Sequence, residues 1–217
     1  MEHNIEMDKF RKAGLYLVTG TEQSGGRTTE YIVKEALSAG VRLIQLREKN
    51  LDRRTLLYTA EKLSDICHKN DALLIINDYP DIASLSGADG VHLGQNDIPA
   101  EYARKLLPEG IIGVSSHSVE ESSKIVPGEA SYYNIGPIFP TSTKKWDDEF
   151  LGPDKIPEIS SACPLPFTVM GGINKSNIEK VLEKGARTIA VVSAVTAAPS
   201  PGRAAGELLE IIKRFGE

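Results

Sequence analysis

The stretch SAGVRLI, residues 38–44, holds the pattern that decides the fold, because it joins the end of a helix to a buried strand. A small residue and a glycine end the helix, and an apolar, β-branched run follows. The same pattern returns as GADGVHL at residues 87–93 and as GARTIAV at residues 185–191. This weak internal repeat indicates a chain built from successive helix–strand units.

Eight β-rich apolar runs occur along the chain, and each is followed by a segment able to form a helix. They are GLYLVT from Gly14, RLIQL from Arg42, ALLIIN from Ala72, GVHLG from Gly90, GIIGVS from Gly110, YYNIG from Tyr132, FTVMGG from Phe167 and TIAVVSA from Thr188. Eight such units predict a single (β/α)8 TIM barrel over residues 13–217, preceded by an N-terminal extension at residues 1–12. A doubly wound parallel sheet is the alternative fold.

The composition is that of an ordinary globular protein, with 41% hydrophobic and 25% charged residues among 217. A net charge of −5, without a block of basic residues, argues against nucleic acid as a partner. No apolar run approaches the length of about 18 residues that a membrane helix needs, and the polar N-terminus lacks a secretory pattern. Cys67 and Cys163 match no metal spacing, so we expect a reduced, cytoplasmic protein.

Polar residues follow these strands, where a TIM barrel carries its active site. Within VRLIQLREKN, residues 41–50, the side chains of Gln45, Arg47 and Lys49 point the same way over roughly 13 Å. Arginine offers phosphate a bidentate fork and lysine a point charge, so this row predicts an anion site. The structural alternative is that these inward cations only bond backbone carbonyls or a core carboxylate.

Two carboxylates, Asp78 and Asp97, end the third and fourth runs. Adjacent strands lie about 5 Å apart, so both carboxylates can reach one cation. Two carboxylates completed by phosphate oxygens and water predict an Mg²⁺ site. The alternative is that Asp78 caps a helix beginning near Tyr79 and Asp97 caps one beginning at Ile98-Pro99.

A second anion site is expected where the seventh and eighth strands end. Gly171-Gly172 precede a helix predicted to begin at about Asn174, and Val192-Ser193-Ala194 follow the eighth run. The connection at residues 136–152 is long and carries Thr-Ser-Thr-Lys-Lys, which predicts a mobile lid that binds an anion or, alternatively, a solvated loop. Two anion sites on one rim suit an enzyme that joins two phosphorylated small molecules.

Histidines give weaker signals. His3 and His68 are expected at the surface, and His92, inside a strand, is expected to be a satisfied core imidazole. His117, just beyond the fifth run, faces the rim and either moves protons or makes a polar contact.

At these residues the sequence resembles the thiamine-phosphate synthase family, also called thiamine-phosphate pyrophosphorylase. The resemblance runs from LYLVTG to the last helix. It rests on the ordered motifs QLREK, IND, GVHLGQND, GVSSH, GPIFPTSTKK, MGGIN and VVSAV. Each motif is short, but their order and their positions at strand ends make the set specific.

The resemblance implies a (β/α)8-barrel transferase that condenses hydroxymethylpyrimidine diphosphate with a thiazole phosphate, carboxylated or not, and requires Mg²⁺. By resemblance Asp78 and Asp97 hold Mg²⁺, while Arg47, Lys49, Ser115 and Lys144 act in catalysis. The implied substrate-binding residues are Gln45, Leu46, Arg47, Glu48, Lys49, Asn77, Ser115, Thr141, Ser142, Thr143, Lys144, Gly172, Val192 and Ser193.

The implied chemistry fits these residue types. An aminopyrimidine can expel diphosphate before the thiazole nitrogen attacks, so the step needs charge neutralisation and exclusion of water rather than a protein nucleophile. Gly20 stands where the family usually has Asp.

Two alternatives stay open. A related thiazole tautomerase carries a histidine at the position of His117, but it lacks the Asn-Asp pair and the later acidic residue. A non-catalytic thiamine-phosphate-binding regulator would not need the metal carboxylates. The expected partners are small-molecule substrates, with no membrane and no nucleic acid, in a possible homo-oligomer.

Overall fold

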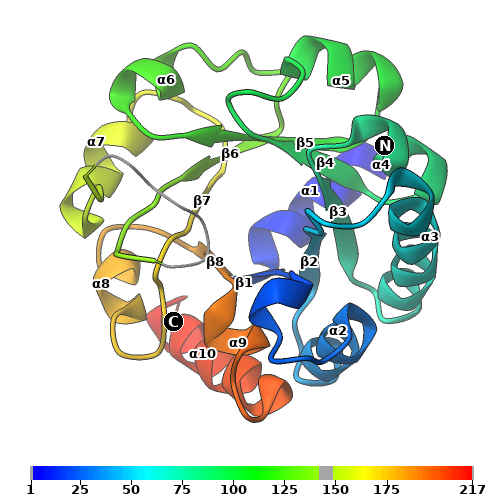
Figure 1. The fold of residues 1–217 in the computed structure, drawn as a ribbon. Helices are drawn as coiled ribbons and strands as arrows, with labels where there is room; N and C mark the ends of the chain where they lie inside the picture. Colours follow the sequence, from blue (N-terminus) through cyan, green and yellow to red (C-terminus); the bar gives the residue numbers. More distant parts are fainter. Residues whose placement is uncertain (1, 142–148, 217) are drawn as a thin grey trace.

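The computed structural model describes residues 2–141 and 149–216, and its eight parallel strands form a closed barrel (Figure 1). Each strand pairs with the next one in sequence, and β8 pairs with β1. The predicted (β/α)8 barrel is therefore confirmed, and the doubly wound alternative is wrong. The strands are β1 (Leu15–Val18), β2 (Leu43–Leu46), β3 (Leu73–Asn77), β4 (Gly90–Leu93), β5 (Ile111–Ser116), β6 (Tyr132–Ile135), β7 (Phe167–Val169) and β8 (Thr188–Val191).

Helices surround this barrel, as Figure 1 shows. Apolar stripes face the strands; in α3, for example, Leu56, Ala60, Leu63 and Cys67 are buried. The helices are α1 (Glu2–Lys12), α2 (Thr29–Ser38), α3 (Arg53–Lys69), α4 (Pro80–Ser86), α5 (Ala100–Leu106), α6 (Val119–Ser123), α7 (Ile156–Ser160), α8 (Ile178–Leu182), α9 (Ser193–Thr196) and α10 (Pro201–Gly216), with 3-10 turns η1 (Thr21–Gln23) and η2 (Pro153–Lys155). Within the described residues, no helix is both long enough and apolar enough to cross a membrane.

The repeated helix-to-strand pattern has a conformational cause. Gly40, Gly87 and Gly185 all have positive φ angles, of 101°, 68° and 91°. Only glycine adopts this region freely, so it ends each helix and turns the chain toward the next strand.

The N-terminal end of the barrel is closed by α1. Phe10 is fully buried, and its ring centroid lies 4.4 Å from that of Tyr132 inside the barrel. Met7 belongs to the same apolar cluster, which also contains residues from β1, β2 and β3. The segment predicted as an extension thus forms a helix that fills one end, and the C-terminal ends of the strands remain for a ligand.

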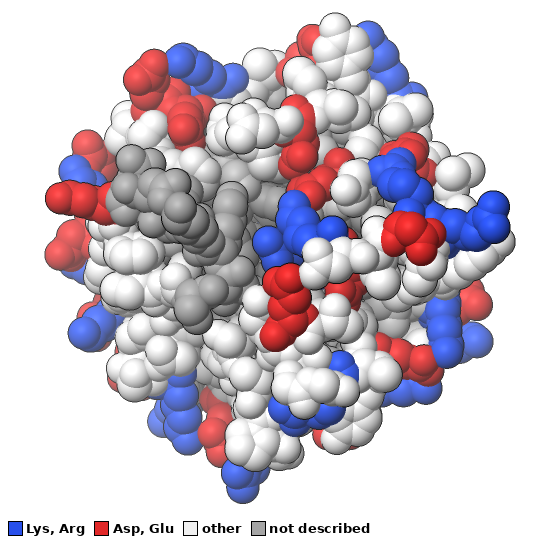
Figure 2. Space-filling view, in the orientation of Figure 1, with Lys and Arg blue, Asp and Glu red and all other residues white. Residues whose placement is uncertain are grey.

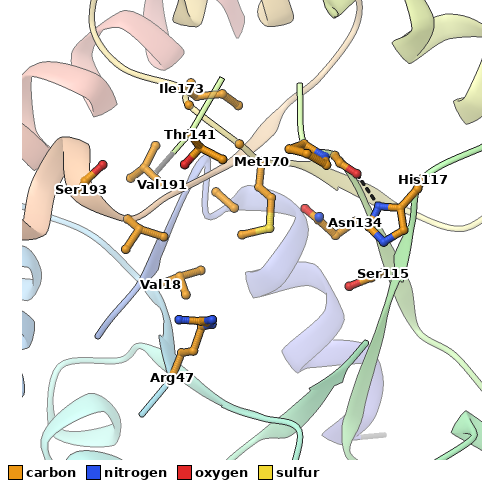
Figure 3. A pocket seen from close by; sticks show the side chains of 16 residues that line it. Val18, Arg47, Ser115, His117, Asn134, Thr141, Met170, Ile173, Val191 and Ser193 are labelled. Atoms are coloured by element: carbon orange, nitrogen blue, oxygen red, sulfur yellow. Dashed lines mark hydrogen bonds between the residues drawn. The ribbon is translucent and has the colours of Figure 1, made fainter. Parts of the chain in front are cut away.

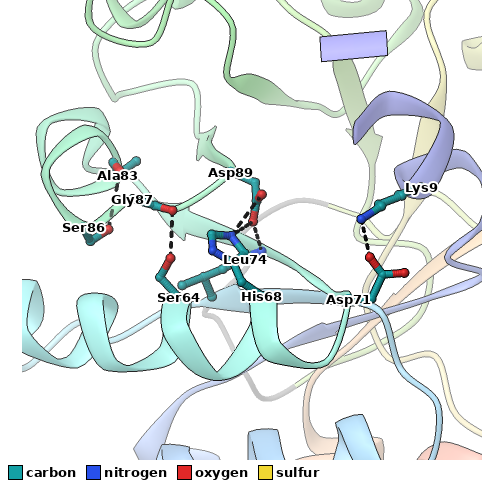
Figure 4. A network of polar contacts seen from close by, with 9 residues as sticks. All are labelled: Lys9, Ser64, His68, Asp71, Leu74, Ala83, Ser86, Gly87 and Asp89. Atoms are coloured by element: carbon teal, nitrogen blue, oxygen red, sulfur yellow. Dashed lines mark hydrogen bonds and ion pairs between the residues drawn. The ribbon is translucent and has the colours of Figure 1, made fainter. Parts of the chain in front are cut away.

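A polar network also ties elements together at the N-terminal end (Figure 4). One carboxylate oxygen of Asp89 accepts from the Leu74 backbone N–H at 2.7 Å and lies 3.1 Å from the His68 ring. Lys9 of α1 pairs with Asp71 before β3. This network joins α3 and β3 far from the rim, so its role is structural.

Candidate active site

A pocket of about 130 Å³ opens at the C-terminal ends of β1 and β5 to β8 (Figure 3). Its polar lining residues include Arg47, Ser115, His117, Asn134, Thr141 and Ser193. Its apolar lining residues include Val18, Met170, Ile173 and Val191, and the two kinds are interspersed (Figure 3). The pocket therefore suits a ligand that has both a flat apolar portion and an anionic or hydrogen-bonding group.

Arg47 follows β2 and presents its guanidinium group to this pocket. The residue is half-buried, and its guanidinium makes no hydrogen bond or ion pair with any residue that the structure describes. A half-buried cation without a protein partner is costly unless a ligand supplies the opposite charge. The structural alternative for Arg47, bonding to carbonyls or a core carboxylate, is therefore wrong, and the arrangement favours an anion site.

The neighbours of Arg47 in β2 turn elsewhere. Gln45 is 3% exposed, and its amide nitrogen donates to the Tyr16 hydroxyl at 2.7 Å inside the barrel. Leu46 is buried in the core between strands and helices. Neither residue lines the pocket, so a substrate contact for Gln45 or Leu46 stays a prediction.

Glu48 and Lys49 engage other side chains. The Glu48 carboxylate accepts from the hydroxyls of Thr21 at 2.6 Å and Thr29 at 2.5 Å, which fastens the loop after β1. The Lys49 ammonium group forms an ion pair with Asp78. Lys49 thus sits at the predicted metal carboxylates rather than in the pocket.

Asp78 and Asp97 lie close to one another at the ends of β3 and β4. Burial and the neighbouring Asp78 carboxylate raise the pKa of Asp97, although the Gly94 backbone N–H, 2.6 Å from its Oδ2, lowers it. The helices that follow begin with Tyr79 and Pro99 at their N-caps and have no side-chain cap bond. The capping alternative is therefore wrong for both carboxylates.

These two carboxylates fit Mg²⁺ by their chemistry. Oxygen donors are the ligands that Mg²⁺ prefers, and a Lys49 ammonium group already marks a place for positive charge beside Asp78. Asp78 also has a φ angle of 68°, a left-handed conformation that is uncommon outside glycine. Among the described residues there is no cluster of three or more metal-binding side chains, so other ligands would have to complete the coordination.

Ser115 and His117 stand on one wall together with Asn134 (Figure 3). The Ser115 hydroxyl lies 3.1 Å from Nε2 of the buried His92, a Ser–His pairing that the sequence motifs did not reveal. His117 donates from Nδ1 to the Gly136 carbonyl, and its backbone N–H donates to Glu121 at 2.6 Å. His92 is a hydrogen-bonded core imidazole as predicted, and burial lowers its pKa to about 4.

The glycine turn after β7 closes the opposite wall. Gly171 and Gly172 have φ angles of 104° and 63°. A Cβ at Gly172 would lie 2.3 Å from the Pro140 carbonyl oxygen, so glycine lets the loop after β6 approach. Close approach of a phosphate, which the sequence suggests as the reason for this glycine, stays a prediction.

The helix predicted to begin at about Asn174 begins instead at Ile178. Asn174 Oδ1 accepts from the Ser176 backbone N–H at 2.9 Å, and Asn177 Oδ1 accepts from the Asn174 N–H at 2.8 Å. These local bonds hold a turn where the sequence predicted the first helical residues, because Asn side chains compete for backbone groups.

The predicted substrate residues divide into three groups. The pocket brings together Arg47, Ser115, Thr141, Gly172, Val192 and Ser193. Off its lining are Gln45, Leu46, Glu48, Lys49 and Asn77. Ser142, Thr143 and Lys144 belong to the part of the predicted lid, residues 142–148, that lies outside the described residues.

Sequence reasoning missed Asn134 and the apolar lining residues of the pocket. Asn134 is 3% exposed in β6, and its Oδ1 accepts from the Thr168 hydroxyl at 2.8 Å. A lone amide within the apolar run YYNIG was the available signal. Met170 and Val191 look like ordinary core residues in the sequence, so nothing marked them as pocket residues.

Charges of both signs meet on this face of the molecule. Figure 2 shows basic and acidic side chains side by side near its centre, next to the undescribed segment. Such a mixture suits a ligand whose negative groups are shared between protein cations and a carboxylate-bound metal.

The closed barrel and the pocket at the C-terminal ends of its strands have the architecture of a TIM-barrel enzyme. Residues 15–195 match the family model described as thiamine monophosphate synthase. Thiamine-phosphate synthase of Archaeoglobus fulgidus is 43% identical over 201 residues, 93% of this chain and 94% of that protein. The thiamine-phosphate synthase of Caldicellulosiruptor saccharolyticus is 34% identical over 211 residues, covering 97% and 96%.

A solved structure agrees with these matches. Thiamine phosphate pyrophosphorylase from Pyrococcus furiosus superposes with a TM-score of 0.87 at 34% identity, covering 95% of this chain and 98% of that one. The chain therefore belongs to the thiamine monophosphate synthase family, as the motifs at its strand ends predicted.

Proposed function

We propose that this enzyme joins hydroxymethylpyrimidine diphosphate to a thiazole phosphate and releases thiamine phosphate and diphosphate. The observation that carries the proposal is the Arg47 guanidinium, which faces the pocket without a partner among the described residues. Membership of the family supports the choice of substrates, because the relatives bear the name thiamine-phosphate synthase.

Arg47 binds the departing diphosphate in this proposal. Its planar fork can donate two parallel hydrogen bonds to phosphate oxygens. As the C–O bond to the pyrimidine methylene breaks, negative charge grows on the diphosphate, and a cation already in place lowers that barrier. The thiazole nitrogen then attacks the methylene carbon, so no covalent bond to the protein forms.

Asp78 and Asp97 are proposed to hold Mg²⁺, which would supply Lewis-acid neutralisation of the diphosphate. The closeness of the two carboxylates and the raised pKa of Asp97 support this role, since burial and the like charge of Asp78 both disfavour the ionised carboxylate and a bound cation offsets both. Lys49, now paired with Asp78, would exchange that partner for a phosphate oxygen.

The thiazole phosphate is proposed to lie at the other side of the pocket, near Thr141, Gly172, Val192 and Ser193. The apolar side chains of Met170 and Ile173 can cover the thiazole ring and exclude water. Ser142, Thr143 and Lys144 keep their proposed roles from the family resemblance, with Lys144 reaching the diphosphate.

One assay tests the reaction. Purified protein is mixed with both substrates and Mg²⁺, and thiamine phosphate and diphosphate are quantified with and without excess chelator. Formation of both products in equal amounts, abolished by chelator, is expected. Isomerisation of a thiazole without condensation would instead identify the protein as a thiazole tautomerase, the alternative that His117 suggests. A cytoplasmic location and a homo-oligomeric state also stay predictions.

A further inference from the structure

A continuous chain of buried side-chain hydrogen bonds crosses the inside of the barrel and ends at the pocket. It begins at Gln45, whose Nε2 lies 2.7 Å from the Tyr16 hydroxyl. The Tyr16 and Tyr132 hydroxyls are 3.0 Å apart, and Tyr132 lies 2.9 Å from Nδ1 of His92. His92 Nε2 then lies 3.1 Å from the Ser115 hydroxyl, which lines the pocket.

The packing around this chain leaves its members little room to move. Tyr16 and Tyr132 are at most 1% exposed, and Gln45 and His92 are at most 6% exposed. A Cβ at Gly113 would lie 2.1 Å from Cζ of Tyr132, so only glycine there admits the tyrosine ring. Phe10 covers the same ring from the N-terminal end. The chain is therefore a preorganised part of the site.

Counting protons fixes the direction of the first hydrogen bonds. The Gln45 amide nitrogen can only donate, so the Tyr16 oxygen accepts. The single Tyr16 proton then goes to the Tyr132 oxygen, because Tyr132 is the other partner of that hydroxyl. Burial raises the pKa of both phenols far above neutrality, so each hydroxyl keeps its one proton to donate.

The direction continues through His92. Tyr132 has used its oxygen to accept from Tyr16, so its proton points to Nδ1 of His92. Nδ1 is then an acceptor, and the imidazole proton resides on Nε2 and points to the Ser115 oxygen. If Nδ1 carried the proton instead, the buried hydroxyl proton of either Tyr132 or Tyr16 would have no acceptor among the described residues, which costs about 1–3 kcal/mol.

We propose that His92 is a positioning residue that fixes Ser115 as a hydrogen-bond donor to the bound substrate. Because Nε2–H occupies a lone pair of the Ser115 oxygen, the hydroxyl proton of Ser115 turns to the pocket. The site at Ser115 then selects a ligand atom with a free lone pair, such as an unprotonated ring nitrogen of a heteroaromatic substrate.

The same hydrogen-bond direction excludes a role for Ser115 as a nucleophile. A serine acts as a nucleophile when a histidine nitrogen accepts its proton, and here that nitrogen donates instead. The Ser115–His92 pair thus resembles a catalytic dyad in distance only. The identity of the heteroaromatic ring as the pyrimidine rests on the proposed function, whereas the donor direction does not.

The direction can be measured without substrate. Nitrogen-15 NMR of the folded protein at neutral pH distinguishes the two tautomers of each imidazole, and the loss of one signal in His92→Gln assigns His92 among the four histidines. The expected result is a proton on Nε2 and none on Nδ1. A proton on Nδ1 alone would overturn the proposal, whatever reaction the enzyme catalyses.

The tautomer should also depend on Tyr132. In Tyr132→Phe the donor to Nδ1 is lost, so the His92 signal should shift toward a mixture of tautomers. Tyr133→Phe is the matched control. Tyr133 lies on the same strand, but its hydroxyl donates to the Ser160 backbone carbonyl at 3.3 Å and takes no part in the buried hydrogen-bond chain. An unchanged His92 signal in Tyr132→Phe would show that the tyrosines do not set the direction.

Kinetics test the consequence for the substrate. A pyrimidine diphosphate with a C–H group in place of one ring nitrogen loses the atom that accepts from Ser115. One of the two such analogues should show a kcat/KM about tenfold below that of the normal substrate, the size of one lost hydrogen bond. If kcat/KM of the wild-type enzyme fell for neither analogue, the assignment of a pyrimidine ring nitrogen as the acceptor from Ser115 would be refuted.

Three variants complete this test. His92→Asn can keep the contact to Tyr132 but not that to Ser115, and Ser115→Ala removes the donor itself. Both should abolish the tenfold discrimination, and their effects should not add. His92→Gln, whose amide can donate at the Nε2 position, should restore discrimination. Tyr133→Phe should leave it intact. Discrimination that persists in a folded Ser115→Ala protein would refute the role of the hydroxyl, and failure of the wild type to condense the substrates would refute only the proposed function.

Discussion

Replacing Arg47 with methionine should weaken substrate binding strongly and leave the fold almost untouched. The guanidinium makes no side-chain bond to the described residues, so its removal costs no internal hydrogen bond. We expect the free energy of unfolding to change by no more than about 0.5 kcal/mol. Methionine keeps an unbranched apolar stem and removes the guanidinium with its charge and its donors.

The expected effect on binding follows from the lost bonds to phosphate. Two charge-assisted hydrogen bonds contribute at least about 1.5 kcal/mol each, or about 3 kcal/mol together. At about 1.4 kcal/mol per factor of ten, kcat/KM for the diphosphate substrate should fall about 150-fold. The KM for the thiazole phosphate should change much less. Steady-state kinetics with each substrate varied in turn, together with urea unfolding, measure both quantities.

Arg104 supplies the matched contrast. Its guanidinium donates to the carbonyls of Leu107 at 2.9 Å and Gly110 at 2.7 Å, among several others at the N-terminal end of the barrel. Arg104→Met should therefore destabilise the protein by about 2–4 kcal/mol while kcat/KM stays within a factor of two or so. If Arg47→Met destabilised the fold to the same degree, or left the KM for the diphosphate unchanged, the assignment of Arg47 as a ligand residue would be wrong.

Three further changes separate the metal site, the loop packing and the scaffold. Because the pKa of Asp97 is raised in the fold, its carboxylate destabilises the metal-free protein once the pH rises through that pKa. Asp97→Asn should therefore raise Tm at neutral pH and abolish any further rise in Tm on adding Mg²⁺. A lower Tm in Asp97→Asn would contradict the expected destabilising effect of the carboxylate. Gly172→Ala should destabilise the fold by more than about 1 kcal/mol in urea unfolding, since its Cβ meets the Pro140 oxygen at 2.3 Å and its φ angle is 63°; unchanged stability would show that the loop yields. Asp89→Ala should cost about 2–3 kcal/mol of stability with normal kcat, because it leaves the Leu74 N–H without its carboxylate; a fall in kcat would show that the two ends of the barrel are coupled.

The fold was predictable because a closed barrel repeats one local pattern. Each of the eight apolar runs corresponds to an observed strand, with ends that coincide or differ by up to three residues. FTVMGG and TIAVVSA show the largest shifts, and β7 stops at Val169 because Gly171 and Gly172 leave the extended conformation. Such shifts follow from turn geometry, which the apolar pattern does not encode.

The site was predictable only in part. Alternation along a strand correctly placed Gln45 and Arg47 on one face, but it does not show how deep in the barrel each side chain lies. Gln45 lies one layer below the pocket, where Tyr16 occupies its amide, while Arg47 reaches the surface of the cavity. Asn134 and Met170 join the pocket because β6 pairs with β5 and β7 pairs with β6 around the closed barrel, and a single sequence does not show which inward residues reach the rim.

The polar interior of the barrel has a chemical consequence for the proposed reaction. Expulsion of diphosphate leaves an electron-poor pyrimidine methylene, which any available protein nucleophile could trap. Ser115 lines the pocket and has a histidine beside it, so it would be such a nucleophile if His92 accepted its proton. Tyr16 and Tyr132 prevent this by holding the imidazole as a donor, which keeps the Ser115 oxygen occupied. The buried tyrosines therefore reserve the methylene for the thiazole nitrogen, although neither tyrosine lines the pocket.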